Sequence, residues 1–280
     1  MRVSEVVTRM LESKSQRGHR KVYVKELERA LTRFAELTGN PPLSEVSPKQ
    51  CETFIFRSES PGGQATRRSR LSALFSFAIR SRLRTENPLD YIPELRKAET
   101  QPPRILSPHE ARTILQYLQK RPRCLAWFAL GMFSGLRPCE ALRTRWEDIR
   151  FQTGTLLIHG ANSKTRRHRI IELHPTAIRW LSEAQAAGSE LPIHPQPIRR
   201  ELRRLRPRLE LSKWPQDVLR HSCASYSLAL SNDFTKTAWQ LGNSEKILLR
   251  HYYRLTDRET AMAYWQTLPN QACQLELFPP

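Results

Sequence analysis

Two arginines of the 280-residue chain lie in short polar motifs that could do phosphate chemistry, Arg137 in SGLRPCEALR and Arg220 in DVLRHS. A guanidinium group presents a planar fork of N–H donors that fits two phosphate oxygens. It also stabilises the negative charge that builds in a pentacoordinate transition state. Arg137 alone could equally form a weak surface ion pair with Glu140. Phosphate binding and simple ion pairing are therefore both open.

A basic run, ANSKTRRHR at 161–169, contains Lys164 next to Arg166 and Arg167. The plain interpretation is a solvated cluster that meets a polyanion as point charges. The neighbouring positive charges would also lower the pKa of the Lys164 ammonium, which could then act as a general acid.

Two adjacent tyrosines, Tyr252 and Tyr253, follow the tripeptide LGN in a predicted helix. Tyrosines in such places are usually half-buried packing residues, although a phenol can also serve as a nucleophile. Successive helical residues point ~100° apart, so only one of the two can face a given site.

The composition indicates a folded protein with a polyanionic partner. Lysine and arginine number 46 against 27 acidic residues, a formal charge of +19, and 39% of residues are hydrophobic, which excludes a disordered basic tail. No run of ~18 apolar residues occurs and the start lacks an apolar signal core, so we expect a cytoplasmic protein without a membrane partner. The five cysteines contain no CxxC pair, so we expect neither a disulfide framework nor a zinc site, and no metal or cofactor.

The first hundred residues are predicted to be helical. One helix spans 22–39 and ends at glycine, and a second begins at Ser47-Pro48. We expect SPGG at 60–63 to break the chain before a basic amphipathic helix at 64–83. The polar face of that last helix carries three candidate DNA-binding residues, Arg67, Arg68 and Arg70.

A proline-rich, charged stretch at 93–108 is typical of a connector, which predicts a domain boundary near residue 100. Beyond it, Ser107, Pro108 and Glu110 predict the start of a helix. The period then changes, and 149–173 predicts a small antiparallel sheet before helices resume at 175. The fold class is therefore mainly α with a small antiparallel β-sheet. The sheet is expected to rest on Leu156, Ile158, Ile170 and Ile171.

Arginine, lysine, arginine and tyrosine occur in that order at 137, 164, 220 and 252, each within its own motif. On these residues the chain resembles the tyrosine recombinase (phage integrase) family over about residues 105–265. The resemblance implies a helical core-binding (SAM-like) domain at 1–98 that clamps DNA. A mixed α/β catalytic domain at 99–280, with a C-terminal tail, would follow it.

The resemblance also implies a role for each motif residue. Arg137 and Arg220 would clamp the phosphate, and Lys164 would enter the minor groove and protonate the departing 5′ oxygen. Because the family nucleophile lies nine positions after the third residue of its LGH motif, here Asn243, it corresponds to Tyr252. The implied activity is that of a site-specific DNA recombinase or integrase, which cleaves and rejoins strands through a covalent 3′-phosphotyrosine and needs no metal or nucleotide cofactor.

Two positions depart from the family pattern, which usually has histidine at the place of Asp217 and histidine or tryptophan at that of Asn243. A DNA-binding protein with a degenerate recombinase-like catalytic domain is therefore the alternative, and covalent trapping on nicked DNA distinguishes the two. A type IB topoisomerase would share the residue set, but the short chain and separate clamp favour recombination. An ionised Asp217 could pair with Arg220 three residues later. His221 and His251 are equally well explained as packing or capping residues.

The resemblance implies double-stranded DNA as partner, with a homo-tetramer assembled on paired DNA sites through the C-terminal tail. That tail, QACQLELFPP, carries Leu275, Leu277 and Phe278 after the nucleophile helix. A frayed terminus is the plain alternative. Since no further domain precedes the helical clamp, we do not expect recognition of separate arm-type DNA sites.

Overall fold

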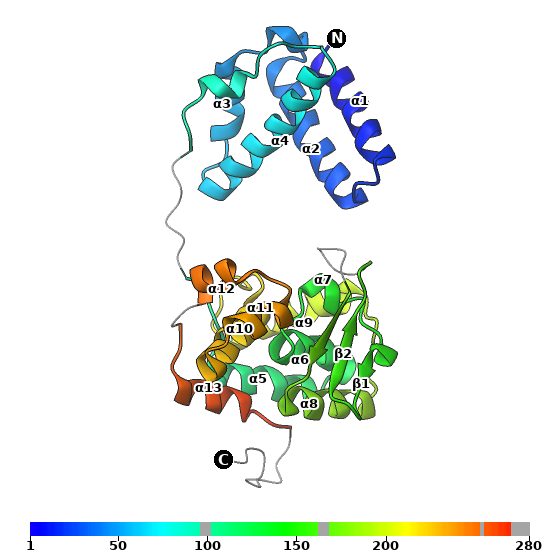
Figure 1. Ribbon diagram of the computed structural model, residues 1–280, viewed down its shortest axis with the longest axis vertical. Coiled ribbons are helices and arrows are strands. Elements are labelled where there is room, and N and C mark those ends of the chain that lie inside the picture. The colour runs from blue at the N-terminus through cyan, green and yellow to red at the C-terminus, as the bar shows by residue number, and fades with distance from the viewer. Residues whose placement is uncertain (96–101, 162–167, 253–254, 270–280) are drawn as a thin grey trace. The chain divides into compact units, whose positions relative to one another are not determined.

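The computed structural model describes residues 1–95, 102–161, 168–252 and 255–269. The chain divides into two compact units, Met1–Thr100 and Gln101–Pro280 (Figure 1). No helix within the described ranges is long and apolar enough to cross a membrane.

The first unit is helical in its described part. The helix predicted at 22–39 is confirmed, since Leu27, Leu31 and Phe34 are buried along one face of it and left-handed Gly39 (φ 75°) ends it. The helices are α1 (Val3–Gln16), α2 (Lys21–Thr38), α3 (Pro48–Phe56) and α4 (Pro61–Arg80), with short 3-10 helices at Leu43–Glu45 and Pro88–Tyr91.

The SPGG segment begins a helix instead of separating two. Ser60 Oγ accepts a hydrogen bond from Gly63 N at 3.2 Å, and Pro61 is the first residue of α4. The first N–H groups of a helix lack an intrahelical acceptor, so proline loses nothing there and serine satisfies one of them. The prediction of a break at 60–63 was therefore wrong by one helical turn.

The second unit contains the remaining described helices and the sheet. Ser107 and Glu110 form the predicted capping box, with Ser107 Oγ accepting from Glu110 N at 3.1 Å. The α-helices are α5 (Pro108–Gln119), α6 (Leu125–Phe133), α7 (Pro138–Ala141), α8 (Pro175–Ala186), α9 (Pro195–Arg208), α10 (Val218–Ser231), α11 (Phe234–Leu241), α12 (Glu245–Tyr252) and α13 (Arg258–Trp265), and the 3-10 helices span Pro122–Cys124 and Trp146–Asp148.

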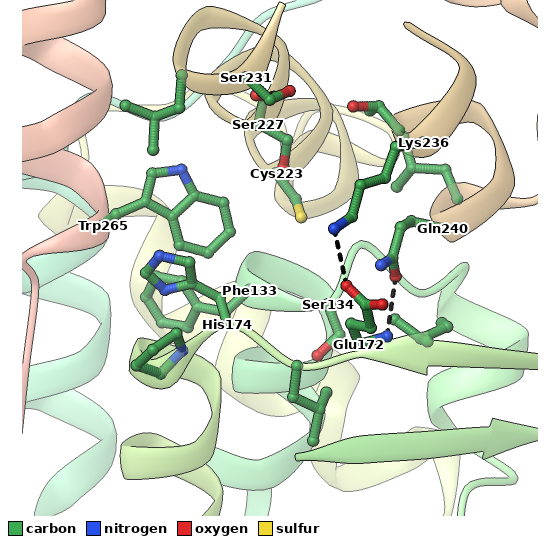
Figure 2. A pocket seen from close by; sticks show the side chains of 16 residues that line it. Phe133, Ser134, Glu172, His174, Cys223, Ser227, Ser231, Lys236, Gln240 and Trp265 are labelled. Carbon is green, nitrogen blue, oxygen red and sulfur yellow. Dashed lines mark hydrogen bonds and ion pairs between the residues drawn. The ribbon is translucent and has the colours of Figure 1, made fainter. Parts of the chain in front are cut away.

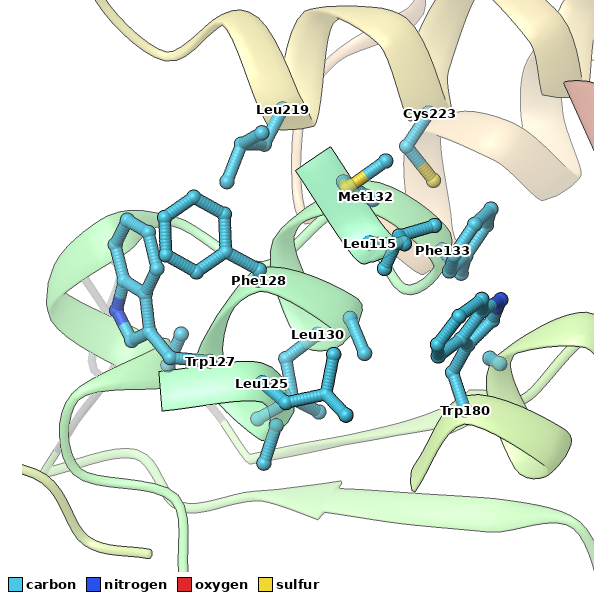
Figure 3. Close-up of a cluster of buried hydrophobic side chains, with 14 of the residues drawn as sticks. Leu115, Leu125, Trp127, Phe128, Leu130, Met132, Phe133, Trp180, Leu219 and Cys223 are labelled. Atoms are coloured by element: carbon cyan, nitrogen blue, oxygen red, sulfur yellow. The ribbon is translucent and has the colours of Figure 1, made fainter. Parts of the chain in front are cut away.

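Helix α6 is the centre of this unit, because all nine of its residues are buried. Figure 3 shows its side chains between Leu219 and Cys223 of α10 and Trp180 of α8. A Cβ at Gly131 would lie 3.0 Å from the Leu219 side chain, so glycine permits the close approach of α6 and α10. This packing fixes the amino-terminal turn of α10 over the end of α6.

The predicted antiparallel sheet is confirmed. Strands β1 (Ile149–Arg150), β2 (Thr155–Ile158) and β3 (Arg169–Glu172) pair in the order β1-β2-β3. Leu156 and Ile171 lie opposite each other and both are buried, whereas Ile170 is 55% exposed. Successive strand residues point to opposite faces, so Ile170 and Ile171 cannot both face the core, and the prediction for Ile170 was wrong.

Candidate active site

Arg137 lies at the amino-terminal end of α7, directly after a turn at Gly135 (φ 61°). Its Nη1 is 3.1 Å from Glu140 Oε1, so the ion pair considered from the sequence does form. Glu140 is only 1% exposed, however, and the pair is not the weak surface contact that an isolated motif suggests.

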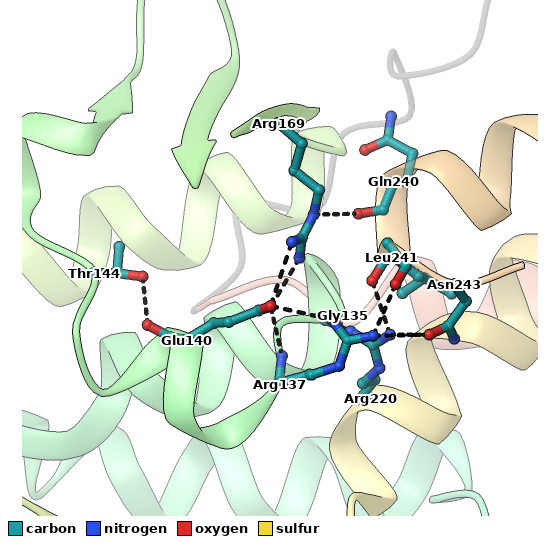
Figure 4. Close-up of polar contacts among 10 residues, drawn as sticks. Gly135, Arg137, Glu140, Thr144, Arg169, Arg220, Gln240, Leu241 and Asn243 are labelled. Atoms are coloured by element: carbon teal, nitrogen blue, oxygen red, sulfur yellow. Dashed lines mark hydrogen bonds and ion pairs between the residues drawn. The ribbon is translucent and has the colours of Figure 1, made fainter. Parts of the chain in front are cut away.

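The Glu140 carboxylate also holds a second arginine, Arg169 of β3. Arg169 donates from Nη2 to Glu140 Oε2 at 2.8 Å and from Nη1 to Oε1 at 3.3 Å. Burial alone would raise the pKa of Glu140, but the hydrogen bonds and charges of Arg169 and Arg137 outweigh it and hold that pKa below its ordinary value. The carboxylate is therefore ionised at neutral pH and fixes the orientation of Arg137 (Figure 4).

Arg220 lies in the first turn of α10 and is 5% exposed. Its Nη1 donates to Gly135 O at 2.7 Å, and its Nη2 donates to Leu241 O at 2.8 Å and to Asn243 Oδ1 at 2.9 Å. Burial, and then the positive charge of Arg137, lower the pKa of Arg220 to about 10, so the guanidinium remains charged at neutral pH. Backbone carbonyls therefore hold a buried cation without neutralising it.

Asn243 joins the two arginines. Its Oδ1 accepts from Arg137 Nη2 at 3.0 Å as well as from Arg220, and Arg137 Nη2 also donates to Gly242 O at 2.8 Å. A Cβ at Gly242 (φ 62°) would lie 3.2 Å from the Arg169 guanidinium, so this turn needs glycine. Asn243 Oδ1 thus accepts from both arginines, while the N–H groups of its amide make no hydrogen bond to an acceptor among the described residues and can donate to a ligand.

Tyr252 is the last residue of α12, and its side chain is buried at 5% exposure. Its Oη lies 2.7 Å from Nδ1 of His221. Burial raises the pKa of the phenol, while the charges of Arg220 and Arg137 oppose that rise. The hydroxyl is therefore protonated at neutral pH and lies within electrostatic reach of both arginines.

His221 is the residue beside Tyr252 to which the sequence interpretation gave no role at the site. It follows Arg220 in the first turn of α10 and is half-buried. The available signal was its position beside a motif arginine at the start of a helix. The contact with Tyr252 spans 31 residues, and no local pattern predicts it.

Asp217 occupies the position before α10 in a left-handed conformation (φ 52°), and its side chain does not cap the helix. The ion pair with Arg220 that the sequence suggested is not formed between these two described residues, because Gly135, Leu241 and Asn243 take the Arg220 donors. Burial lowers the pKa of His221 and raises that of Tyr252, and the negative charge of Asp217 tends to raise both.

Three of the predicted residues, Lys164, Arg166 and Arg167, lie between β2 and β3 in the sequence and outside the described residues. The other candidate DNA-binding arginines lie on α4 and contact their own unit. Arg67 donates to Phe54 O at 2.8 Å, and Arg68 donates to carbonyls within residues 89–93 at 3.1 to 3.2 Å. Arg70 pairs with a carboxylate of α2 at 2.9 Å. Each of these three side chains thus helps to hold the first unit together.

Residues 104–259 match the phage integrase family. The chain belongs to this family and is a tyrosine-type site-specific DNA recombinase. No curated protein sequence matches it.

The fold of the chain is similar to solved integrase structures. A lambda integrase (75–356) dimer bound to a COC′ core site has a TM-score of 0.70 and 17% identity, covering 99% of this chain and 100% of that one. A lambda integrase tetramer bound to a Holliday junction has a TM-score of 0.70 and 19% identity, covering 87% and 78%. A singly substituted Tn1549 transposon integrase (82–397) in complex with a circular intermediate DNA has a TM-score of 0.66 and 17% identity, covering 94% and 98%.

Proposed function

We propose that Tyr252 is the nucleophile of this recombinase and that Arg137 and Arg220 bind the phosphate it attacks. The observation that carries the proposal is that Arg137 and Arg220 meet on Asn243 Oδ1, while Tyr252 is hydrogen-bonded to His221, the residue after Arg220. In the reaction the Tyr252 oxygen bonds to phosphorus and the bond to the 5′ oxygen breaks. The product is a 3′-phosphotyrosine and a free 5′ hydroxyl, and the reverse step rejoins a strand.

The two guanidinium groups are held in place with donors to spare. A guanidinium has five N–H groups, and within the described residues Arg137 and Arg220 each use three, in hydrogen bonds to backbone carbonyls, to Asn243 and, for Arg137, to Glu140. The remaining N–H groups are the donors that would bind nonbridging phosphate oxygens, and side chains already held in place are the condition for electrostatic stabilisation of a transition state. The Asn243 amide can add one more donor.

Covalent trapping tests this function. A pool of duplexes with randomised sequence around a nick is incubated with the protein, because a nick beside the cleavage position lets the short 5′-hydroxyl fragment leave. Adducts that survive denaturation are then recovered and sequenced. We expect a 3′-linked adduct on a defined sequence, whereas DNA binding without any adduct would favour the degenerate catalytic domain.

We further propose that Lys164 protonates the departing 5′ oxygen. Lys164→Ala should slow cleavage of the selected duplex by about 10²–10⁴-fold while changing DNA affinity little. A duplex with sulfur at the 5′ bridging position should restore the rate, because a thiolate leaves without a proton. Lys120→Ala, at an exposed lysine after α5, is the control and should cleave both duplexes like the wild type. A Lys164→Ala defect that sulfur does not relieve would contradict the acid role.

The DNA interface is proposed to involve both units, with residues 1–98 as the core-binding clamp and 99–280 as the catalytic domain. The charge of +19 supports a phosphate-dominated interface. Arg166 and Arg167 would add phosphate contacts beside Lys164. The α4 arginines already make intramolecular contacts, so only their unused N–H groups could bind DNA; these residues are Arg67, Arg68 and Arg70.

Assembly is proposed to be a homo-tetramer on paired sites, in which the tail of one protomer docks on its neighbour. The second unit has a cavity of about 380 Å³ lined from β3, α8, α10, α11 and α13 (Figure 2). Apolar surface from Phe133, Leu230 and Trp265 lines it, and the Lys236–Glu172 ion pair lies at its polar side. Such a cavity fits the apolar side chains of the tail, Leu275, Leu277 and Phe278.

Truncation after Pro269 should spare binding to a single half-site and abolish cooperative filling of paired sites. The cut lies beyond Thr267, which is buried and whose carbonyl accepts from Trp180 Nε1 at 2.6 Å, so the folded unit stays intact. Gel shifts on single and paired sites measure both properties. The double variant Leu277→Ala with Phe278→Ala, in the full-length chain, should reproduce the loss. Unchanged cooperativity in both would contradict docking of the tail.

A further inference from the structure

We propose that His221 is the catalytic base of this recombinase, taking the phenolic proton from Tyr252 at the moment Tyr252 attacks phosphorus. The inference rests on the proposed role of Tyr252. Asp217, at the position where the family usually has histidine, makes no hydrogen bond to Tyr252 within the described residues, whereas His221 does.

The geometry is that of a base and its nucleophile. His221 Nδ1 and Tyr252 Oη are 2.7 Å apart, and the rings lie with centroids 5.4 Å apart, inclined by 39°. We assign the Tyr252 hydroxyl as the donor and Nδ1 as the acceptor, which places the imidazole proton on Nε2. Direct hydrogen bonding of a base to the attacking oxygen is the arrangement that general-base catalysis requires.

The surroundings keep the imidazole neutral and ready to accept. Burial lowers the pKa of His221, Asp217 opposes this with its negative charge, and Arg220 and His251 lower the pKa further. Among the described residues, the charged or titratable groups that act on the ring are Asp217, directly before α10, Arg220 of α10, and His251 and Tyr252 of α12. Near pH 7 the base is therefore in its active, unprotonated form.

The step balances without any outside reactant. The Tyr252 oxygen forms its bond to phosphorus, its proton moves to His221 Nδ1, and the bond to the 5′ oxygen breaks as Lys164 supplies that oxygen with a proton. In rejoining, the 5′ hydroxyl attacks and its proton passes back to Lys164, while the His221 imidazolium returns its proton to the departing Tyr252 oxygen. The Asp217 carboxylate stabilises the transient imidazolium, which gives this unusual residue a positioning and electrostatic role.

The test is the single-turnover rate of adduct formation on the selected nicked duplex. His221→Gln keeps a hydrogen-bond acceptor for the Tyr252 hydroxyl but has no base, and we expect a rate about 10²–10⁴-fold lower. His109→Gln is the control, because His109 is an exposed histidine in the first turn of α5 and takes no part in the site. This variant should react at close to the wild-type rate.

The pH profile separates a base from a residue that only packs. The wild-type rate should rise with pH through the lowered pKa of His221, below its ordinary 6.5, and then level off. In His221→Gln the plateau should be replaced by a rate that keeps rising roughly tenfold per pH unit, because the phenol must then ionise by itself. A His221→Gln rate and profile like those of the wild type would overturn the inference.

Two further measurements, the wild-type pH profile and the adduct yield of Tyr252→Phe, distinguish failure of the His221 role from failure of the proposed nucleophile. If His221→Gln fails to fold, the wild-type profile decides, and a rate that shows no fall on the acid side over the whole pH range in which the protein stays folded would overturn the role of His221. Loss of the adduct in Tyr252→Phe marks the proposed nucleophile independently. An enzyme that depends on Tyr252 but not on His221 therefore refutes only this inference, whereas an adduct that persists in Tyr252→Phe refutes the proposed function.

Discussion

Tyr252→Phe should abolish covalent adducts on the selected nicked duplex and leave DNA affinity close to that of the wild type. Phenylalanine keeps the ring in its buried place at the end of α12 but removes the only atom that can bond to phosphorus. Denaturing gels report the adduct, and gel shifts under native conditions report the affinity. This is the largest effect expected of any single substitution in the chain.

Tyr253→Phe is the matched control, since it removes one hydroxyl from the neighbouring position in the sequence. It should form adducts as the wild type does. The reverse pattern, with adducts retained in Tyr252→Phe and lost in Tyr253→Phe, would move the nucleophile by one residue and contradict the nine-residue spacing from Asn243.

Glu140→Gln should lower the free energy of unfolding by about 3–5 kcal/mol, because it leaves the buried Arg169 guanidinium without a counterion. Arg169 is 8% exposed and Glu140 is its ion-pair partner at 2.8 Å. For a unit of this size the loss corresponds to a fall in Tm of roughly 10 °C. Thermal and denaturant unfolding both measure it.

Glu147→Gln provides the control, since Glu147 pairs with Arg145 where both side chains are exposed, at 72% and 63%. Glu147→Gln should lower the free energy of unfolding by at most about 1 kcal/mol. Equal losses in the two variants would contradict a structural role for the Glu140 carboxylate.

At acid pH, the free energy of unfolding of Glu140→Gln should come closer to that of the wild type. The pKa of Glu140 is lower in the folded protein than its ordinary 4.5. Its contribution is therefore fully present above about pH 4.5 and is lost as pH falls through the folded-state pKa, when the carboxyl takes up a proton. The variant, which has no carboxyl at this position, should lack that part of the acid dependence. A difference that stays constant down to about pH 3 would contradict this assignment.

Local patterns predicted most of the helices, because their signals lie within a few residues of each other. Ser47-Pro48 and Ser107-Pro108 mark two helix starts that the structure confirms. The sheet was also predicted. Ile170 was wrongly placed on its buried face, because two adjacent isoleucines do not reveal which of them points to the core.

The contacts that organise the site could not be predicted from spacing. Glu140 meets Arg169 across 29 residues, and His221 meets Tyr252 across 31. The first pair depends on how α7 and β3 come together in the folded unit, and the second on the packing of α12 against α10. The possible pairing of Asp217 with Arg220 does not form, for a related reason: carbonyl oxygens of Gly135 and Leu241 and the Asn243 side chain accept the guanidinium hydrogen bonds instead.

The turn after α11 mechanically links the arginines to the nucleophile. Both guanidinium groups are tied to residues 241–243 by four hydrogen bonds, and α12 begins only two positions later, at Glu245. Between the tied segment and the helix stands one residue, Ser244, whose carbonyl accepts from Ile247 N and Leu248 N at 3.0 and 3.2 Å. A rigid swing of α12 that withdraws Tyr252 must therefore hinge at Ser244 or else release both arginines. If α12 moves about any other point, the same movement withdraws Tyr252 and breaks the hydrogen bonds that hold the two phosphate-binding arginines, so the protomer loses both functions together.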